Sequence, residues 1–406
     1  MVKCSTQKRD TETEFYLVNG QVITPYRMIA PGGVHVKGEY IQRVFAMADG
    51  HIPEGAKVID VRGAWIMPGL IDMHLHGGGG ADVMDGSAAA IRTIARIHAE
   101  GGTTAILPTT LTSSLRELRL ALDACKLVST ERAKGARLLG VHLEGPYFAH
   151  AQRGAQDPRY IKNPEPDEYL ALLNDYPFIK RISAAPELHG ALELGRELRK
   201  RGVLAAIGHT DATHDEVIAA VEAGYSHMTH LYSGMAGVRR FNCYRVAGAI
   251  ESGLLLDDVT VEVIADGKHL PASLLKLIYK CKGAERMALC SDALRAAGMP
   301  EGRYFLGSGE DGQEILVEEG VAWLADKSAF AGSVVRGNQL IKTMVELAEV
   351  PIQAAVKMAT ITPARILHVD NVMGSLDQGK YADITILRDD FSVVSTIVGG
   401  RSVYSS

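Results

Sequence analysis

The sequence lacks the features of membrane, secreted and nucleic-acid-binding proteins. No apolar run approaches the roughly 20 residues that a transmembrane helix needs. The first ten residues are polar and lack the apolar stretch of a signal peptide. The cysteines number only five and are scattered, so they indicate reduced thiols in a cytoplasmic protein and exclude a disulfide framework. The net charge of -5 at pH 7 argues against a nucleic-acid or other polyanionic partner.

His74 and His76 form the most informative pattern that is present, at the end of an apolar, strand-like run over residues 71–76. Residues two apart on a strand face the same way, so the two imidazoles could bind one divalent ion together. The four glycines that follow allow the backbone to turn sharply and approach a ligand closely. Taken alone, the pair could equally be polar residues leaving a strand.

Short apolar runs that end in a ligand-type residue recur along the chain. Beyond the first run, they end in the following residues: Glu144, His209, His230, Asp266, His269 and Asp292. Two more apolar runs, at residues 104–110 and 182–187, end without an obvious ligand. Helix-like stretches lie between the runs, for example at residues 115–127 and 191–201. The chain therefore alternates strands with helices.

Eight such units predict an α/β protein built on a (β/α)8, TIM-like barrel. Strands buried on both faces appear as continuous apolar runs, and parallel strands need helical crossovers. The active site of such a barrel lies at the carboxyl ends of its strands, which is where the ligand-type residues fall. The 406 residues exceed the roughly 250 of a bare barrel, so there is room for a second domain.

The two ends of the chain have a different pattern. Residues 14–66 and 381–404 alternate short β-branched runs with glycine and proline turns, which is typical of antiparallel sheets. We interpret residues 1–66 plus 367–406 as one β-sandwich domain and residues 67–366 as the catalytic barrel. The segment 359–367 is expected to be the last helix before the chain returns to the sandwich, with Pro363 in its first turn.

At this level of detail the motifs resemble those of the amidohydrolase superfamily and, within it, the N-acetylglucosamine-6-phosphate deacetylase family. The resemblance runs almost from end to end. The matching segments are residues 68–77, the H-x-E-G-P motif at 142–146, 208–210, 229–232, the D-G-x-H motif at 266–269, 291–293, 330–333 and 373–383. The H-x-E-G-P, D-G-x-H and D-A motifs in this order are the specific part of the match.

The resemblance implies a divalent-metal site. Glu144, His209 and His230 are expected to bind one ion, and His74 and His76 make room for a second with Glu144 as the bridging carboxylate. Three protein ligands leave a position open for water, as in a catalytic rather than a structural site. One or two ions per subunit are expected. Zinc is favoured, while iron, manganese and cobalt suit the same ligands.

The resemblance also assigns roles to two further residues. Asp292 is expected to take the proton of the attacking water and return it to the leaving amine. His269 is expected to polarise the amide carbonyl. The implied reaction is hydrolysis of N-acetylglucosamine 6-phosphate to glucosamine 6-phosphate and acetate, by a cytoplasmic homodimer whose only ligand partner is the small-molecule sugar.

The chain departs from the family where the phosphate should bind. Ser233 and Gly234 replace an Asn-Ala pair, Asn242 stands where an arginine is expected, and Gln156 replaces a histidine. The neighbouring arginines could supply the charge, because a guanidinium donates two bonds to phosphate. The residues expected around the substrate are Ala155, Gln156, Ser233, Gly234, Arg239, Arg240, Asn242, Arg245, His269, Phe330, Ala331 and Gly332.

Other functions stay open at this point. The substrate could be a different or unphosphorylated N-acetyl amino sugar, such as N-acetylgalactosamine or its 6-phosphate. A cyclic-amide hydrolase is disfavoured, because residues 182–187 contain no lysine to bridge two metals. A non-catalytic metal protein would not need Asp292 beside an open site.

Several residues near the motifs have two interpretations. His142 and His227 each lie two residues before an expected ligand, so they are either ordinary core residues or hydrogen-bond partners of the ligands. His189 and His214 are expected at the surface. Cys290 is expected in the core, with a metal role as the alternative.

Overall fold

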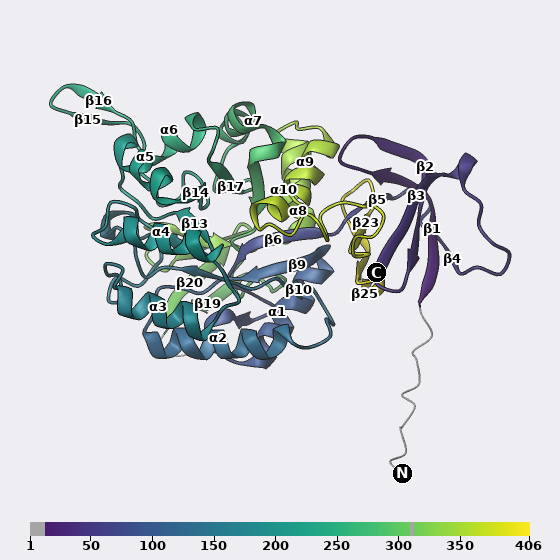
Figure 1. Ribbon diagram of the computed structural model, residues 1–406, viewed down its shortest axis with the longest axis horizontal. Helices are drawn as coiled ribbons and strands as arrows, with labels where there is room; N and C mark the ends of the chain where they lie inside the picture. The colour runs from purple at the N-terminus through teal and green to yellow at the C-terminus, as the bar shows by residue number, and fades with distance from the viewer. Residues whose placement is uncertain (1–12, 309–311) are drawn as a thin grey trace, which may run out of the picture.

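The computed structural model describes residues 13–308 and 312–406, and it shows a barrel-like α/β body beside a sheet formed by the two ends of the chain (Figure 1). The polar N-terminal segment discussed above and Cys4 lie outside the described residues. The C-terminus ends at the sheet, next to the first strands of the chain.

Parallel strands form the centre of the body. In sequence order they are β6 (Leu70–Leu75), β9 (Thr103–Pro108), β11 (Val141–Glu144), β12 (Ile179–Ala184), β13 (Leu204–Ile207), β14 (Tyr225–Met228), β17 (Thr260–Ile264) and β18 (Met287–Cys290). The last six form one sheet in chain order, and β6 pairs with β9, which pairs with the short β10 (Arg137–Leu138). Two parallel bridges, Thr109 to His142 and Leu75 to Ala293, connect the two sheets. The body is thus a TIM-barrel-like α/β fold.

Helices follow most of these strands. They are α1 (Ala88–Glu100), α2 (Leu115–Ser129), α3 (Pro166–Asp175), α4 (Ala191–Arg201), α5 (His214–Ala223), α6 (Ala249–Leu255), α7 (Ala272–Arg286), α8 (Gly337–Lys342), α9 (Ile352–Met358) and α10 (Ile361–Ile366). Shorter turns are the 3₁₀ segments η1 (Met47–Asp49), η2 (Val83–Asp85) and η3 (His150–Gln152) and the π-helical η5 (Thr343–Leu347).

The helix boundaries follow local sequence signals. At the start of α2, the Ser114 side chain accepts a bond from the Glu117 amide and the Glu117 carboxylate accepts one from the Ser114 amide, which is a capping box. The helices predicted at residues 115–127 and 191–201 are confirmed as α2 and α4. The helix predicted at residues 359–367 is confirmed as the shorter α10. No helix in the described ranges is long and apolar enough to cross a membrane.

The two ends of the chain meet in one hydrogen-bonded sheet. Its strands are β1 (Glu14–Ile23), β2 (Met28–Lys37), β3 (Tyr40–Ala46), β4 (Val58–Asp60), β5 (Trp65–Pro68), β23 (Ile384–Leu387), β24 (Val393–Val398) and β25 (Arg401–Ser405). The strand order is β25-β24-β23-β5-β1-β2-β3, with β4 paired to β1. The antiparallel pair of β5 and β23 joins the N-terminal strands to the C-terminal ones. Buried Leu17, Val34 and Ile384 belong to the separate apolar cluster of this sheet.

Three small β elements extend from the body. β7 (Gly77–Gly78) and β8 (Ala81–Asp82) form a tight pair directly after the first barrel strand. The hairpin of β15 (Arg239–Phe241) and β16 (Tyr244–Val246) projects from the body beyond α5 (Figure 1). After β18 comes a four-stranded antiparallel sheet that the sequence pattern did not predict: β19 (Gly302–Leu306), β20 (Gln313–Glu318), β21 (Val321–Leu324) and β22 (Phe330–Ser333).

Candidate active site

The ligand-type side chains converge at the carboxyl ends of the parallel strands. His74 lies on β6, Glu144 is the last residue of β11, and His209 and His230 follow β13 and β14 by two residues. His209, His230 and Asp292 have positive φ angles of 48°, 28° and 48°, so the backbone turns sharply just after each strand. Positive φ angles are uncommon for residues other than glycine, and strained backbone of this kind clusters at functional sites.

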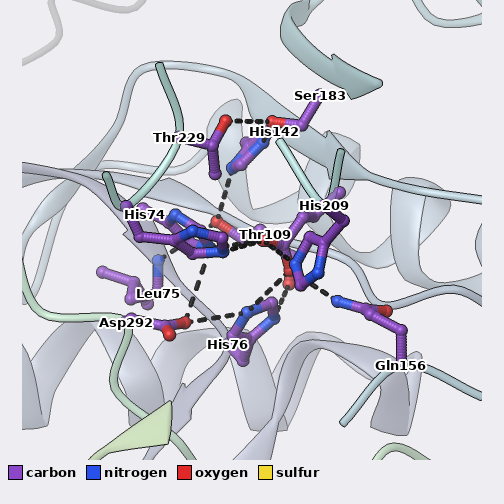
Figure 2. A network of polar contacts seen from close by, with 12 residues as sticks. His74, Leu75, His76, Thr109, His142, Gln156, Ser183, His209, Thr229 and Asp292 are labelled. Atoms are coloured by element: carbon purple, nitrogen blue, oxygen red, sulfur yellow. Dashed lines mark hydrogen bonds and ion pairs between the residues drawn. The ribbon is translucent and has the colours of Figure 1, made fainter. Parts of the chain in front are cut away.

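Glu144 is at the centre of this group. Its Oε1 lies 3.0 Å from His230 Nε2, 3.4 Å from His209 Nε2 and 3.2 Å from His74 Nε2. Its Oε2 lies 3.3 Å from His76 Nε2. Two triplets therefore share this carboxylate, one with His74 and His76 and one with His209 and His230, and the ligand atoms within each lie within 4.8 Å of one another. Figure 2 shows the rings of His74, His76 and His209 turned toward a common centre, with Asp292 beside them.

The electrostatics of the pocket favour positive charge. Burial raises the pKa of Glu144, but the neighbouring imidazoles, His74 foremost, outweigh it and hold the pKa well below its usual range. Burial lowers the pKa of His76, but the carboxylates of Asp292 and Glu144 outweigh it and raise the pKa to about 9. A pocket whose carboxylates stabilise positively charged histidines also suits a divalent cation, which competes with those protons for the imidazole nitrogens.

A second observation also indicates that these side chains could bind a divalent ion. His74 Nε2 is buried and has no hydrogen-bond partner of acceptable geometry in the described structure, although it lies close to the Glu144 carboxylate. A buried polar nitrogen normally has a partner, since leaving it unpaired is costly. Carboxylate and imidazole are common ligands of zinc and related divalent metals.

Asp292 lies on the open side of the same group. Its Oδ1 is 3.1 Å from His76 Nε2 and 3.4 Å from His74 Nε2. Burial raises its pKa, but the two imidazoles outweigh it, and the pKa is lowered overall. The carboxylate is therefore ionised at neutral pH and can accept a proton. Backbone bonds from Asp292 to His74 and from Ser333 to Asp292 fix the turn that carries it.

A cavity of about 230 Å³ opens over these groups. His269 lines it, with Nδ1 2.7 Å from Asp266 Oδ2 and its ring 4.9 Å from that of Phe330. The Asp266 bond orients the imidazole toward the cavity. The predicted substrate residues that line the cavity are Ala155, Gln156, Ser233, Gly234, His269, Phe330, Ala331 and Gly332. Phe330 and its neighbours reach it on β22, because Ser333 bridges to Ala293 at the end of β18.

Comparison with known proteins identifies the family. Residues 65–403 match the sequence profile of the amidohydrolase family. The chain belongs to this family. It is 35% identical to the N-acetylglucosamine-6-phosphate deacetylase of Vibrio furnissii over 84% of this chain and 83% of the relative. It is also 35% identical to the N-acetylgalactosamine-6-phosphate deacetylase of Escherichia coli O157:H7, over 83% of this chain and 87% of the relative.

Solved structures of similar proteins extend the match to the whole fold. The N-acetylglucosamine-6-phosphate deacetylase of Pasteurella multocida superposes with a TM-score of 0.90 at 26% identity, over 97% of this chain and all of that one. A mutant of the Mycobacterium smegmatis enzyme in complex with N-acetyl-D-glucosamine-6-phosphate gives 0.88 at 29% identity, over the same shares of the two chains. The match confirms that this chain is an amidohydrolase with the fold of these deacetylases.

Gln156, which the motif resemblance places where the family has a histidine, binds the central carboxylate. Its Nε2 donates to Glu144 Oε2 at 2.7 Å, and its Oε1 accepts from the Thr112 amide at 2.8 Å. Gln156 is buried and points toward the histidine group (Figure 2). The substitution therefore supplies an uncharged donor to the carboxylate oxygen that also faces His76.

The hairpin arginines lie elsewhere. Arg239, Arg240, Asn242 and Arg245 are exposed on the β15–β16 hairpin and do not line the cavity of the same chain. Arg239 instead donates to the backbone oxygen of Asp211 at 2.9 Å and pairs with its carboxylate. The structure therefore brings the metal-type residues together but leaves the predicted phosphate arginines apart from them.

The structure also shows the surroundings of the histidines whose roles the sequence left open or placed at the surface. His142 bonds Ser183 at 2.7 Å and Thr109 at 3.3 Å, within the chain of contacts in Figure 2. His227 bonds Thr260 at 2.8 Å. Neither ring contacts Glu144 in the described contacts. His189 is exposed and His214 is half-buried.

Cys290 and two charged residues complete the buried surroundings. Burial, with Glu262 and other nearby carboxylates adding to it, raises the pKa of the Cys290 thiol well above its usual value. The Cys290 sulfur also lies within 4.8 Å of ligand atoms of His74 and Glu262, in a third group of metal-type residues. Arg181 and Glu262 are fully buried, and the sequence analysis gave them no role. The sequence did contain a signal for them, because each of these two residues places a charge within an apolar strand. A buried charge of this kind needs a partner.

Proposed function

We propose that this amidohydrolase hydrolyses the N-acetyl group of N-acetylglucosamine 6-phosphate, giving glucosamine 6-phosphate and acetate. The observation that carries the proposal is the ionised Asp292 carboxylate beside two metal-type triplets at the floor of a cavity. A metal scaffold without catalysis has no use for this arrangement. The names of the relatives, at 35% identity over most of the chain, support the same reaction.

Each residue has a role in this reaction. Glu144, His209 and His230 would hold one divalent ion, which we propose to be zinc, and His74 and His76 with Glu144 would hold a second. A divalent ion bound there lowers the pKa of water and polarises a carbonyl oxygen. Asp292 accepts the proton of the attacking water and passes it to the leaving amine, so one group serves as base and then as acid. His269 bonds Asp266 through Nδ1, so its donation to the acetyl oxygen is through Nε2 and requires the ring to carry both protons.

A second candidate function differs from the first only in the configuration of the sugar. The relative that acts on the galacto sugar is as similar in sequence as the one that acts on the gluco sugar, at 35% identity each. Gln156, Ser233 and Gly234 line the cavity, and the sequence analysis noted that all three differ from the family pattern. N-acetylgalactosamine 6-phosphate is therefore the alternative substrate.

We also propose the organisation that the sequence analysis predicted. The parallel bridges at Thr109 and Leu75 support a closed eight-stranded barrel over residues 67–366, and the separate apolar cluster supports a sandwich domain of residues 1–66 plus 367–406. Phe241 and Tyr244 are 67% and 79% exposed on the projecting hairpin, which supports a homodimer. The four described cysteines are unpaired, which supports a cytoplasmic location.

A kinetic comparison tests the substrate assignment. Acetate release is measured with N-acetylglucosamine, N-acetylgalactosamine and their 6-phosphates, using zinc-loaded protein and a chelated control. The proposal expects the highest kcat/KM with N-acetylglucosamine 6-phosphate and loss of turnover on chelation. Preference for the galacto phosphate would establish the alternative, and no acetate from any of the four would contradict both.

A further inference from the structure

A pair of opposite charges is buried among the parallel strands and does not line the cavity. Arg181 on β12 and Glu262 on β17 are both 0% exposed. The guanidinium binds the carboxylate with two bonds, Nη1 to Oε2 at 2.7 Å and Nη2 to Oε1 at 2.6 Å. A buried ion pair of this kind is weak evidence for stability, because removing two charges from water offsets their attraction. The pair therefore calls for a role beyond holding the fold together.

Glu262 contacts two of the residues that hold the metal. Its Oε1 accepts from His74 Nδ1 at 2.8 Å and from the backbone amide of His230 at 3.3 Å. Its Oε2 lies 3.5 Å from His227 Nε2. One carboxylate thus connects the ligand on β6 to the turn after β14.

The bond to His74 fixes how that imidazole is used. Nδ1 faces Glu262, while Nε2 faces Glu144 at 3.2 Å. An imidazole that donates its Nδ1 proton keeps a lone pair on Nε2, which is the form that binds a metal. Glu262 therefore orients the ring and selects the tautomer that is suited to a ligand.

The other candidate histidine ligands have no such partner. His76 Nδ1 faces the backbone oxygen of Thr109 at 3.2 Å, and His209 Nδ1 faces that of Gln152 at 2.8 Å. His230 Nδ1 has no hydrogen-bond partner in the described structure. A carboxylate is a stronger acceptor than a neutral carbonyl oxygen. His74 is therefore distinguished from the other three by a charged partner.

Arg181 fixes the Glu262 carboxylate and also donates hydrogen bonds to two other segments of the barrel. Besides its two bonds to Glu262, it donates to the Met73 backbone oxygen on β6 at 3.3 Å and to Thr229 Oγ1 at 2.9 Å. The Glu262 carboxylate is thus fixed relative to the residue that precedes His74 and to the one that precedes His230.

We propose that Glu262, fixed by Arg181, is a positioning residue that makes His74 a metal ligand and so controls binding of an ion at the His74, His76 and Glu144 position. The inference rests on the proposed metal-dependent function and deepens it. Glu262 touches no substrate, and its effect passes through His74. Partners of this kind typically change metal affinity by about 10- to 100-fold when they are removed.

The test measures metal content and affinity in Glu262→Gln, which keeps the shape and removes the charge. Asp383→Asn is the matched control, because Asp383 is also buried and paired with an arginine, Arg137, but lies at the terminal sheet. Zinc per chain is determined by elemental analysis after dialysis, and affinity by competition with a chelator. We expect Glu262→Gln to bind the ion at the His74 position about 10- to 100-fold more weakly and the control to match the wild type.

A double variant separates positioning from a general loss of stability. If Glu262 acts through His74, the variant with both Glu262→Gln and His74→Ala binds metal no worse than His74→Ala alone. Wild-type affinity and metal content in Glu262→Gln, or a loss that adds to that of His74→Ala, would overturn the proposal. Should Glu262→Gln fail to fold, Arg181→Lys is used. It is expected to weaken the same ion by a smaller factor, and unchanged zinc affinity would overturn the proposal.

Acetate release from N-acetylglucosamine 6-phosphate is measured on the same samples. If the wild type binds metal but releases no acetate, the proposed function fails while the metal measurements still decide the role of Glu262. If acetate release occurs and Glu262→Gln binds zinc like the wild type, only the positioning role fails.

Discussion

The cavity around Glu144 and the β15–β16 hairpin differ in how their residues are held. His74 and Glu144 are at most 1% exposed and come from strands that are far apart in sequence. The hairpin arginines are exposed and belong to one short loop. Parallel strands bring their carboxyl ends to one place, so residues at those ends must meet. A projecting loop has no such constraint, and its residue types alone do not fix where it lies.

The largest expected effect concerns Asp292, the proposed catalytic carboxylate of the cavity. Asp292→Asn keeps the shape but cannot take up a proton, so turnover should fall by about 10²- to 10⁴-fold. Steady-state kinetics with N-acetylglucosamine 6-phosphate measure the loss, and zinc analysis shows whether the metal is retained. A variant with more than about a tenth of wild-type turnover would remove Asp292 from the reaction.

The comparison between the cavity and the hairpin also shows which parts of the fold and site can be predicted from the sequence. The convergence of Glu144, His209, His230 and Asp292 was predictable, because each lies at or just after the end of an apolar run and parallel strands bring those ends together. The role of Glu262 was not, since its partner Arg181 lies 81 residues away and their contact depends on the barrel interior.

The loops show the limit of the sequence pattern more clearly. The strands β19 to β22 form the four-stranded sheet that brings Phe330 to the cavity, yet their pairing depends on hairpin geometry rather than on apolar periodicity. The arginines at 239–245 have the right chemistry for phosphate, and nothing in their local sequence says that the hairpin leaves the body.

The next effect concerns the proposed metal ligands. Glu144→Gln removes the charged ligand that both triplets share, so most of the metal should be lost, and His74→Ala should remove at most one ion. Elemental analysis of dialysed protein measures both. Unchanged metal content in the two variants would show that the convergence around Glu144 is not a metal site.

A smaller effect is expected from the hairpin arginines, and it tests whether the hairpin has any part in binding the phosphate. Arg239, Arg240 or Arg245 can bind the phosphate only if the hairpin approaches a cavity, its own or that of a second chain. Alanine at the arginine that does so should lower kcat/KM for the phosphorylated sugar by about 10- to 100-fold and leave the free sugar nearly unchanged. Arg388→Ala, at an exposed position in the terminal domain, is the control. Equal kcat/KM for free and phosphorylated sugar in the wild type would end the phosphate role.

The last prediction concerns stability rather than turnover, at a histidine beneath the glycine turn after His76. His98 is fully buried, with Nε2 2.9 Å from the Gly77 oxygen, and burial lowers its pKa to about 4. In the unfolded chain the His98 imidazole takes up a proton near pH 6.5, whereas in the folded chain it stays neutral until the pH nears 4. The contribution of neutral His98 to stability is therefore complete above pH 6.5 and is lost as the pH falls toward 4. The loss should reach about 3 kcal/mol.

Urea unfolding of metal-free protein between pH 7.5 and 4 measures this contribution. In His98→Gln, the free energy of unfolding should fall less over the same range, by about the amount that His98 contributes. Parallel curves for the variant and the wild type would mean that His98 is protonated alike in both states.

Anomalous X-ray diffraction from zinc-loaded crystals tests most directly whether the strand ends form a metal-dependent hydrolytic site. The account predicts an anomalous peak about 2.0 to 2.2 Å from a Glu144 oxygen and from the Nε2 atoms of His209 and His230. Asp292 should lie beside it without replacing any of these three ligands. Zinc-loaded crystals with no peak among these residues, or with zinc bound only elsewhere, would contradict it.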